Sequence, residues 1–331
     1  MSESVFILII IILALVFDFI NGFHDTANAV ATSIATGALL PRQAIILAST
    51  LNFIGALVFT GVAQTIGDGI ANPKLLTNGL GVVLAALLAS IIWNLATWYW
   101  GLPSSSSHAL VGSLAGAVTA AVGFSAVNVP GILNIIKSLL FSPLLALFTA
   151  SILMLLCQLL ILSLNLPKTN LYFKKMQIFT AAFQAFSHGT NDAQKTMGII
   201  VFTLVTAGWQ PDLTIPLWVK ISAATAMALG TSVGGWRIIN TVGQKITPLR
   251  PTNGLIADIS SATIIITATL LKLPVSTTHV ISSSVIGVGI VSNGNSVNWQ
   301  VVRKMITTWA ITIPSSFLLG MSLYNLMTLT G

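Results

Sequence analysis

The sequence has little charge and almost no cysteine. Only 6% of its 331 residues are charged and 55% are hydrophobic, whereas a soluble domain carries about 25% charged residues. This composition excludes a soluble globular protein and indicates helices that face lipid or other buried helices. The single cysteine, Cys157, excludes disulfide bonds within the chain and disfavours a thiolate metal site.

The basic residues do not form the compact patch that a nucleic-acid-binding protein needs. The net charge is +7, but the lysines and arginines are scattered or lie near the ends of apolar runs, as in the cytoplasmic loops of membrane proteins. The N-terminus is apolar from Val5 and has no basic leader or clear cleavage site, so we expect a retained first helix. We therefore expect a multi-pass protein of the plasma (inner) membrane, with the lipid bilayer rather than nucleic acid as its partner.

Two polar motifs occur twice each within the apolar background, and together they contain all four histidines. One motif reads FHDTANA at residues 23–29 and SHGTNDA at 187–193, and the other reads LPSSSSH at 102–108 and LPVSTTH at 273–279. Burying a polar cluster inside a membrane costs several kcal/mol unless its groups are paired or bind a ligand. The ordered duplication therefore predicts two related halves with a functional site where they meet.

The spacing of the apolar runs predicts an all-α polytopic membrane protein built from two inverted-topology repeats. Each repeat has three membrane crossings, one of them discontinuous, and a re-entrant helical hairpin. The first repeat spans residues 1–165 with its hairpin at about 80–123, a short linker covers 166–177, and the second repeat spans 178–331 with its hairpin at about 254–291.

Several boundaries follow from the apolar runs and their polar interruptions. The runs at 5–40 and 178–207 exceed the roughly 20 residues of one span, so we expect a break in each, at 21–28 and at 188–192. We also expect a short surface helix at 132–140, separate from a span at 144–162, and one span over 217–242.

Loop charge predicts the topology. The densest basic stretch contains Lys168, Lys174 and Lys175, which places the 166–177 linker in the cytoplasm. Counting crossings from there leaves the basic loop 244–253 inside and the loop containing Asp212 outside. Because three crossings are an odd number, the two halves take opposite orientations and both termini lie outside.

The two Pro-Ser tips are candidate anion sites. Proline ends the incoming helix and serine is a strong N-cap for the outgoing one, and a helix N-terminus carries about +0.5 of an elementary charge and binds anions without lysine. Ordinary capped turns at the membrane surface are the alternative. The candidate anion-binding residues are Ser105, Ser106, Ser107, Ser276, Thr277 and Thr278.

The first motif pair supplies hard oxygen ligands. Asp25 and Asn28 share a helix face, and the second copy offers Asn191 and Asp192. The alignment pairs Asp192 with Asn28 and Asp25 with Gly189, so that each half has a carboxylate and a carboxamide at exchanged positions. A carboxylate beside a bound anion is repulsive unless a cation lies between them. We therefore expect two Na⁺ ions between these four residues and the anion, with helix–helix hydrogen bonding as the alternative.

Asp258 lies in the helix that leads to the second tip and has no acidic counterpart in the first half. It predicts a third cation site, and an ion pair with Lys195 or Arg237 is the alternative. The histidines each stand alone without the spacing of a zinc site, so we expect them to form structural hydrogen bonds rather than to carry protons or bind metal.

The motifs at residues 22–29, 101–108, 187–192 and 273–280 resemble the signatures of the inorganic phosphate transporter (PiT) family. The resemblance covers nearly the whole chain. It implies secondary transport of inorganic phosphate with coupled Na⁺ or H⁺, by a homodimer. In sodium-coupled members an acidic residue is usual where Asp258 stands, which favours Na⁺.

The expected function is therefore secondary active import of phosphate with Na⁺, by alternating access at a site near mid-membrane. Proton-coupled transport, transport of another oxyanion such as sulfate or arsenate, and an anion channel are the alternatives. A membrane enzyme is disfavoured, because the repeat places its His, Asp and Ser residues symmetrically, which one catalytic centre does not need.

Overall fold

The computed structural model describes residues 2–72, 76, 78–161 and 166–330 and is all-helical, as predicted. These residues contain no strand, only one antiparallel bridge between Ala71 and Val127. Six helical stretches among them are long and apolar enough to cross a membrane. The helices are α1 (Glu3–His24), α2 (Thr26–Ala35), α3 (Pro41–Val58), α4 (Gly61–Gly69), α5 (Gly79–Tyr99), α6 (Ser106–Val122), α7 (Val129–Ile161), α8 (Leu166–Thr206), α9 (Leu217–Val233), α10 (Trp236–Asn240), α11 (Pro251–Leu270), α12 (Thr277–Asn293) and α13 (Trp299–Thr330).

The outer surface of the helical bundle is apolar. Large side chains such as Phe148 on α7 and Leu318 on α13 are 60% and 59% exposed. Exposing such an apolar surface to water is unfavourable, whereas contact with lipid tails is not. The largest buried apolar cluster joins α1, α4, α5, α6 and α8, through residues such as Phe17 and Phe202. The chain thus has the surface of a multi-pass membrane protein.

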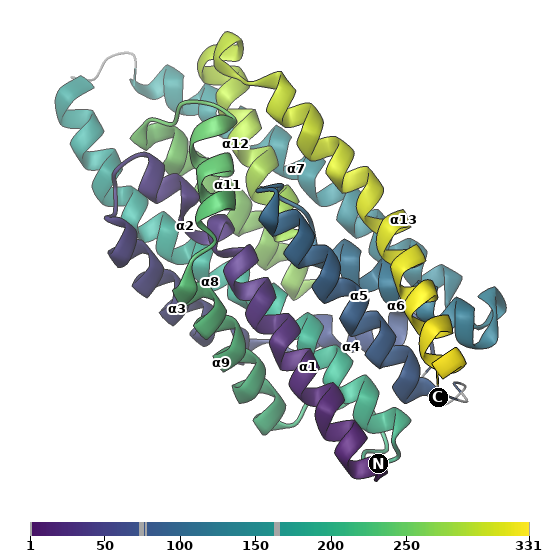
Figure 1. Cartoon of the computed structure of the whole chain (residues 1–331). Helices are drawn as coiled ribbons and strands as arrows, with labels where there is room; N and C mark the ends of the chain where they lie inside the picture. The colour runs from purple at the N-terminus through teal and green to yellow at the C-terminus, as the bar shows by residue number, and fades with distance from the viewer. Residues whose placement is uncertain (1, 73–75, 77, 162–165, 331) are drawn as a thin grey trace.

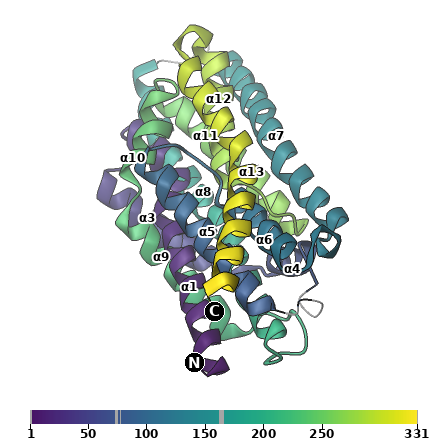
Figure 2. The same cartoon turned by 45° about the vertical axis from the view of Figure 1, so that its right-hand side comes forward.

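The element order of the first half recurs in the second. In each half a hairpin of two helices, α5–α6 or α11–α12, is followed by a one-turn 3₁₀ helix and then a long helix with an internal proline, Pro143 in α7 and Pro314 in α13. Corresponding helices run in opposite directions, α1 against α8 and α7 against α13, and both termini lie at the same end of the molecule (Figures 1 and 2).

The two halves interlock through reciprocal helix pairs. Helix α1 packs on α9 while α3 packs on α8, and α6 packs on α13 while α7 packs on α12. Glycines allow the close approach of the helices in the first two pairs, α1 with α9 and α3 with α8. A Cβ atom at Gly22 would lie 2.3 Å from the carbonyl oxygen of Met227 on α9, and one at Gly189 would lie 2.3 Å from that of Asn52 on α3. Only glycine permits these backbones to approach so closely.

The predicted break at 188–192 is wrong. Helix α1 ends at His24 and α2 begins at Thr26, as expected, but α8 continues unbroken from Leu166 to Thr206. The segment contains no proline, and polar side chains bond within the helix: Thr190 Oγ1 donates to the carbonyl oxygen of Ser187 at 2.7 Å. Polarity alone therefore does not interrupt this helix.

Three further boundaries differ from the sequence prediction. The linker 166–177 is not a loop but the first turns of α8. Helix α7 is continuous through Pro143, because packing against neighbouring helices tolerates proline in membrane helices. The expected span over 217–242 ends at Val233, where Gly234 adopts a φ of 79° that favours glycine.

Candidate functional site

The two hairpin tips meet in the interior. Helix α6 begins after the N-cap Ser105, which accepts a hydrogen bond from the backbone N–H of His108 at 3.2 Å, and α12 begins after Ser276, which accepts one from His279 at 3.3 Å. Ser107 Oγ donates to the carbonyl oxygen of Val275 at 3.0 Å, which joins one tip to the other. All six predicted anion-binding residues are buried, so the two capped tips do not lie on the surface of the protein.

Asp25 stands at the α1–α2 break and contacts both tips. Its Oδ1 accepts a hydrogen bond from Thr278 Oγ1 at 3.0 Å and its Oδ2 accepts one from Ser106 Oγ at 3.4 Å. His24 Nδ1 lies 2.8 Å from Oδ1. Because α1 ends at His24, the break places this carboxylate beside the start of both hairpin helices.

Asn28 lies one turn further along, in α2. Its Nδ2 donates to Thr277 Oγ1 at 3.2 Å and to Thr278 Oγ1 at 3.0 Å. Its Oδ1 is buried and has no hydrogen-bond partner among the described residues. This oxygen is therefore available as a ligand, since a buried carbonyl without a partner is costly.

Asp192 on α8 faces the same region from the other half. Its Oδ2 accepts hydrogen bonds from Thr277 Oγ1 at 3.3 Å and from Asn21 Nδ2 at 3.5 Å. Its Oδ1 lies 2.6 Å from Nζ of Lys195, and this ion pair is buried, with Lys195 only 1% exposed. Asp192 thus contacts the second tip and a cation of its own helix.

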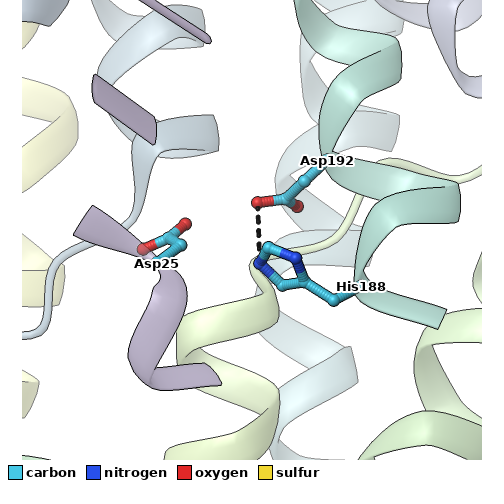
Figure 3. A group of neighbouring side chains, drawn as sticks. All are labelled: Asp25, His188 and Asp192. Carbon is cyan, nitrogen blue, oxygen red and sulfur yellow. Dashed lines mark ion pairs between the residues drawn. The ribbon is translucent and has the colours of Figure 1, made fainter. Parts of the chain in front are cut away.

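The carboxylates of Asp25 and Asp192 point toward one another, with the His188 ring beside Asp192 (Figure 3). His188 Nε2 lies 3.4 Å from Asp192 Oδ2. One ligand atom from each of these three residues lies within 4.8 Å of the others, an arrangement that could hold a metal ion. Carboxylate and amide oxygens are the ligands that hard cations prefer.

Asn191 has a different environment from that of Asp192. Its Nδ2 donates to Thr269 Oγ1 at 2.9 Å and to the Leu273 carbonyl oxygen at 3.2 Å, while its Oδ1 accepts the N–H of Val275 at 3.2 Å. All three partners belong to the second hairpin. Asn191 therefore holds the α11–α12 tip in place.

Asp258 belongs to a separate polar cluster in α11. It accepts hydrogen bonds from Thr32 Oγ1 and, at 3.4 Å, from Gln177 Nε2. The ion pair considered as an alternative does not form in the described part of the chain. Lys195 pairs with Asp192, and the Arg237 guanidinium lies over the ring of Tyr99, 4.8 Å from its centroid.

Two of the four histidines connect different elements by hydrogen bonds. His24 Nε2 lies 3.3 Å from Thr97 Oγ1 on α5, and His188 Nδ1 lies 3.1 Å from Asn52 Oδ1 on α3. The structural role expected for them agrees with these contacts, although His188 also joins the possible metal ligands.

The helix crossings correct the alignment of the first motif pair. Gly22 lies against α9 as Gly189 lies against α3, so the two glycines are equivalent. Asp25 and Asp192 each follow their glycine by three residues. These two aspartates are therefore counterparts, and the exchanged alignment of the sequence analysis is wrong.

Lys195 was missed as a residue of the site, although a signal was present. In the corrected register Asn28 corresponds to Lys195, because each follows its aspartate by three residues. A lysine inside an apolar run is itself a signal for function, since an ionisable group in a membrane segment is costly and rare.

Comparison with known proteins gives consistent matches over the whole chain. The model of the phosphate transporter family matches residues 21–172 and 164–320. A protein of Bacillus subtilis described as a probable low-affinity inorganic phosphate transporter is 54% identical, over 97% of both chains. A Rhizobium meliloti protein of the same description is 41% identical, over 95% of this chain and 94% of its own. A solved structure described as the sodium-dependent phosphate transporter matches with a TM-score of 0.88 and 26% identity, covering 98% of this chain and 99% of the other.

Proposed function

The chain belongs to the phosphate transporter family, and on that premise we propose that it imports inorganic phosphate together with Na⁺ as a secondary active transporter. Members of the family are membrane transporters and not enzymes. The observation that carries the proposal is the meeting of both hairpin tips beside Asp25 and Asp192.

The phosphate site is formed by the first turns of α6 and α12. The first N–H groups of a helix have no partner within it, and each helix start carries about +0.5 of an elementary charge. Two such starts from the two halves offer N–H groups and hydroxyls to one oxyanion. Ser105 and Ser276 cap these helices, and the hydroxyls that bind phosphate directly are those of Ser106, Ser107, Thr277 and Thr278.

The Na⁺ site lies between Asp25 and Asp192, and Asn28 supplies a further ligand through its Oδ1, which has no hydrogen-bond partner among the described residues. Two carboxylates next to the tips repel phosphate until a cation neutralises them, which makes phosphate binding depend on Na⁺. Asn191 contributes by holding the second tip against this site. Asp258 provides a further cation position in its own cluster.

Alternating access requires the site to open to each side in turn, because the tip residues are buried in the structure. Each hairpin helix packs on the long helix of the other half, α6 on α13 and α12 on α7. We propose that the halves form an inverted repeat and that the hairpins move with these partner helices against the rest. We further propose that the chain works as a homodimer in the plasma membrane, with the start of α8 in the cytoplasm and both termini outside.

Proteoliposome uptake tests the proposal. Purified protein is reconstituted, and the uptake of radiolabelled phosphate is measured while the Na⁺ and pH gradients are varied separately. An inward Na⁺ gradient should drive uphill accumulation that a pH gradient alone does not. Accumulation driven only by protons would show H⁺ coupling, the absence of uphill accumulation under any gradient would indicate a channel, and stronger competition by sulfate or arsenate than by phosphate would indicate another oxyanion.

A further inference from the structure

The two halves bring equivalent carboxylates to the site but not equivalent neighbours. Gly22 and Gly189 occupy matching helix crossings, and 167 residues separate them, as they separate Asp25 from Asp192. The same separation relates Phe19, whose carbonyl oxygen lies against Gly230, to Phe186, whose carbonyl oxygen lies against Gly55. The alignment of the first half with the second therefore rests on backbone contacts and not on the similarity of the motifs.

In this register the position of Asn28 is taken by Lys195 in the second half. Asn28 leaves a buried oxygen without a hydrogen-bond partner in the described part of the chain, which suits a cation ligand. Lys195 instead brings a cation, with Nζ 2.6 Å from Asp192 Oδ1. One half thus offers an oxygen ligand to a cation, whereas the other half supplies a positive charge through its own lysine side chain.

We propose that the Lys195 ammonium replaces a coupling cation at the carboxylate of the second half, so that the site between Asp25 and Asp192 binds one monovalent cation per phosphate and not two. This inference rests on the proposed function. Among Asp25, Asp192 and Lys195, two carboxylates and one ammonium leave a single negative charge when the imidazoles and the nearby buried Asp18 are neutral, and one cation neutralises it. Among the described residues, one group of three His, Cys, Asp or Glu side chains, Asp25, His188 and Asp192, brings its ligand atoms within 4.8 Å of one another, which matches this number.

The geometry makes Lys195 a fixed part of the transporter. Lys195 and Asp192 lie three residues apart on α8, one turn of the same helix, and both are buried. An unpaired ammonium is strongly disfavoured in this buried position, so the pair holds together as the site opens and closes. Because the ammonium is tethered, its charge does not cross the membrane with the phosphate.

A direct contact between Lys195 and phosphate is the competing interpretation. In the structure Nζ lies on Asp192 Oδ1 and not among the tip hydroxyls. The two interpretations differ in what Lys195→Asn would do. Loss of a phosphate ligand would lower phosphate affinity with an unchanged charge per phosphate, whereas loss of a built-in cation would admit another Na⁺ and raise the charge moved.

The experiment measures the charge moved per phosphate. Proteoliposomes with no Na⁺ gradient are clamped at several membrane potentials with K⁺ and valinomycin, and the phosphate ratio at zero net flux is plotted against potential. Lys195→Asn should move one more positive charge per phosphate than the parent chain, and Lys195→Arg should match the parent. An unchanged charge number in an active Lys195→Asn protein would overturn the proposal. A cation bound at Asp258 would add the same charge in the variant and in the parent, so it does not change the difference between them.

A binding measurement covers the case in which Lys195→Asn folds but does not transport. Equilibrium dialysis with radiolabelled Na⁺ at saturating phosphate counts the cations bound per chain, and Lys195→Asn should bind one more than the parent. An equal number in the two proteins would overturn the proposal. Absence of phosphate uptake by the parent chain would instead refute the proposed function.

Discussion

The buried ion pair on α8 makes Asp25→Asn and Asp192→Asn unequal in their effect on stability. Asp192→Asn leaves the Lys195 ammonium without its partner at 2.6 Å in a site that is 1% exposed. Breaking a buried ion pair by removing one partner costs about 3–5 kcal/mol. We therefore expect Asp192→Asn to lower the free energy of unfolding by about that amount.

Asp25→Asn removes a carboxylate that has no lysine or arginine partner among the described residues. Its contacts are hydroxyls and an imidazole, and a carboxamide keeps an oxygen acceptor and gains a donor. A hydrogen bond contributes about 0.5–1.5 kcal/mol net, and removing an uncompensated buried charge offsets part of that loss. The expected cost is about 1 kcal/mol or less, so the two variants should differ by at least about 2 kcal/mol.

The assay is reversible unfolding in mixed detergent micelles, followed by tryptophan fluorescence. Na⁺ and phosphate are omitted, because a bound ligand raises apparent stability. The double variant Asp192→Asn with Lys195→Asn is the matched control and should recover most of the loss, because no unpaired charge remains. Equal losses in the two single variants, or a double variant as unstable as Asp192→Asn alone, would refute the reasoning.

Four further outcomes are expected. Asp25→Asn should remove the Na⁺ dependence of radiolabelled phosphate uptake, and a variant that keeps the parent's Na⁺ activation curve would contradict the cation assignment. Ser276→Ala should cost about 1 kcal/mol of stability through the lost N-cap and raise the KM for phosphate several-fold, measured by initial uptake rates. Gly189→Ala should prevent folding, because its Cβ would lie 2.3 Å from a carbonyl oxygen, while Gly294→Ala, with no atom within 4 Å of the new Cβ, should be neutral by size-exclusion chromatography. Asp258→Asn should weaken Na⁺ activation without raising the phosphate KM at saturating Na⁺.

The repeated motifs were sufficient to predict which residues meet. Proline followed by serine specifies where a helix ends and the next one begins, and that signal is local. Two tips placed alike in two related halves have few places to meet other than the interface between them. The contact of Ser107 with Val275, and that of Thr278 with Asp25, follow from this placement.

The register between the two copies could not be predicted in the same way. The strings FHDTANA and SHGTNDA align by their histidines or by their aspartates, and nothing local decides between these alignments. The deciding contacts are between helices, where Gly22 and Gly189 touch carbonyl groups of α9 and α3. The continuity of α8 depends likewise on side chains that find partners in other elements, such as Asn191 on the second hairpin.

The differences between the two halves bear on the direction of transport. An inverted repeat with identical halves would present the same site to both sides of the membrane. Here Lys195 lies one turn beyond Asp192 along α8, whereas Gln177, the partner of Asp258, lies 15 residues before Asp192, or about 22 Å in an α-helix. Lys195 and Gln177 therefore lie on opposite sides of Asp192 along α8. The halves therefore differ in these side chains and in the break between α1 and α2, which α8 lacks.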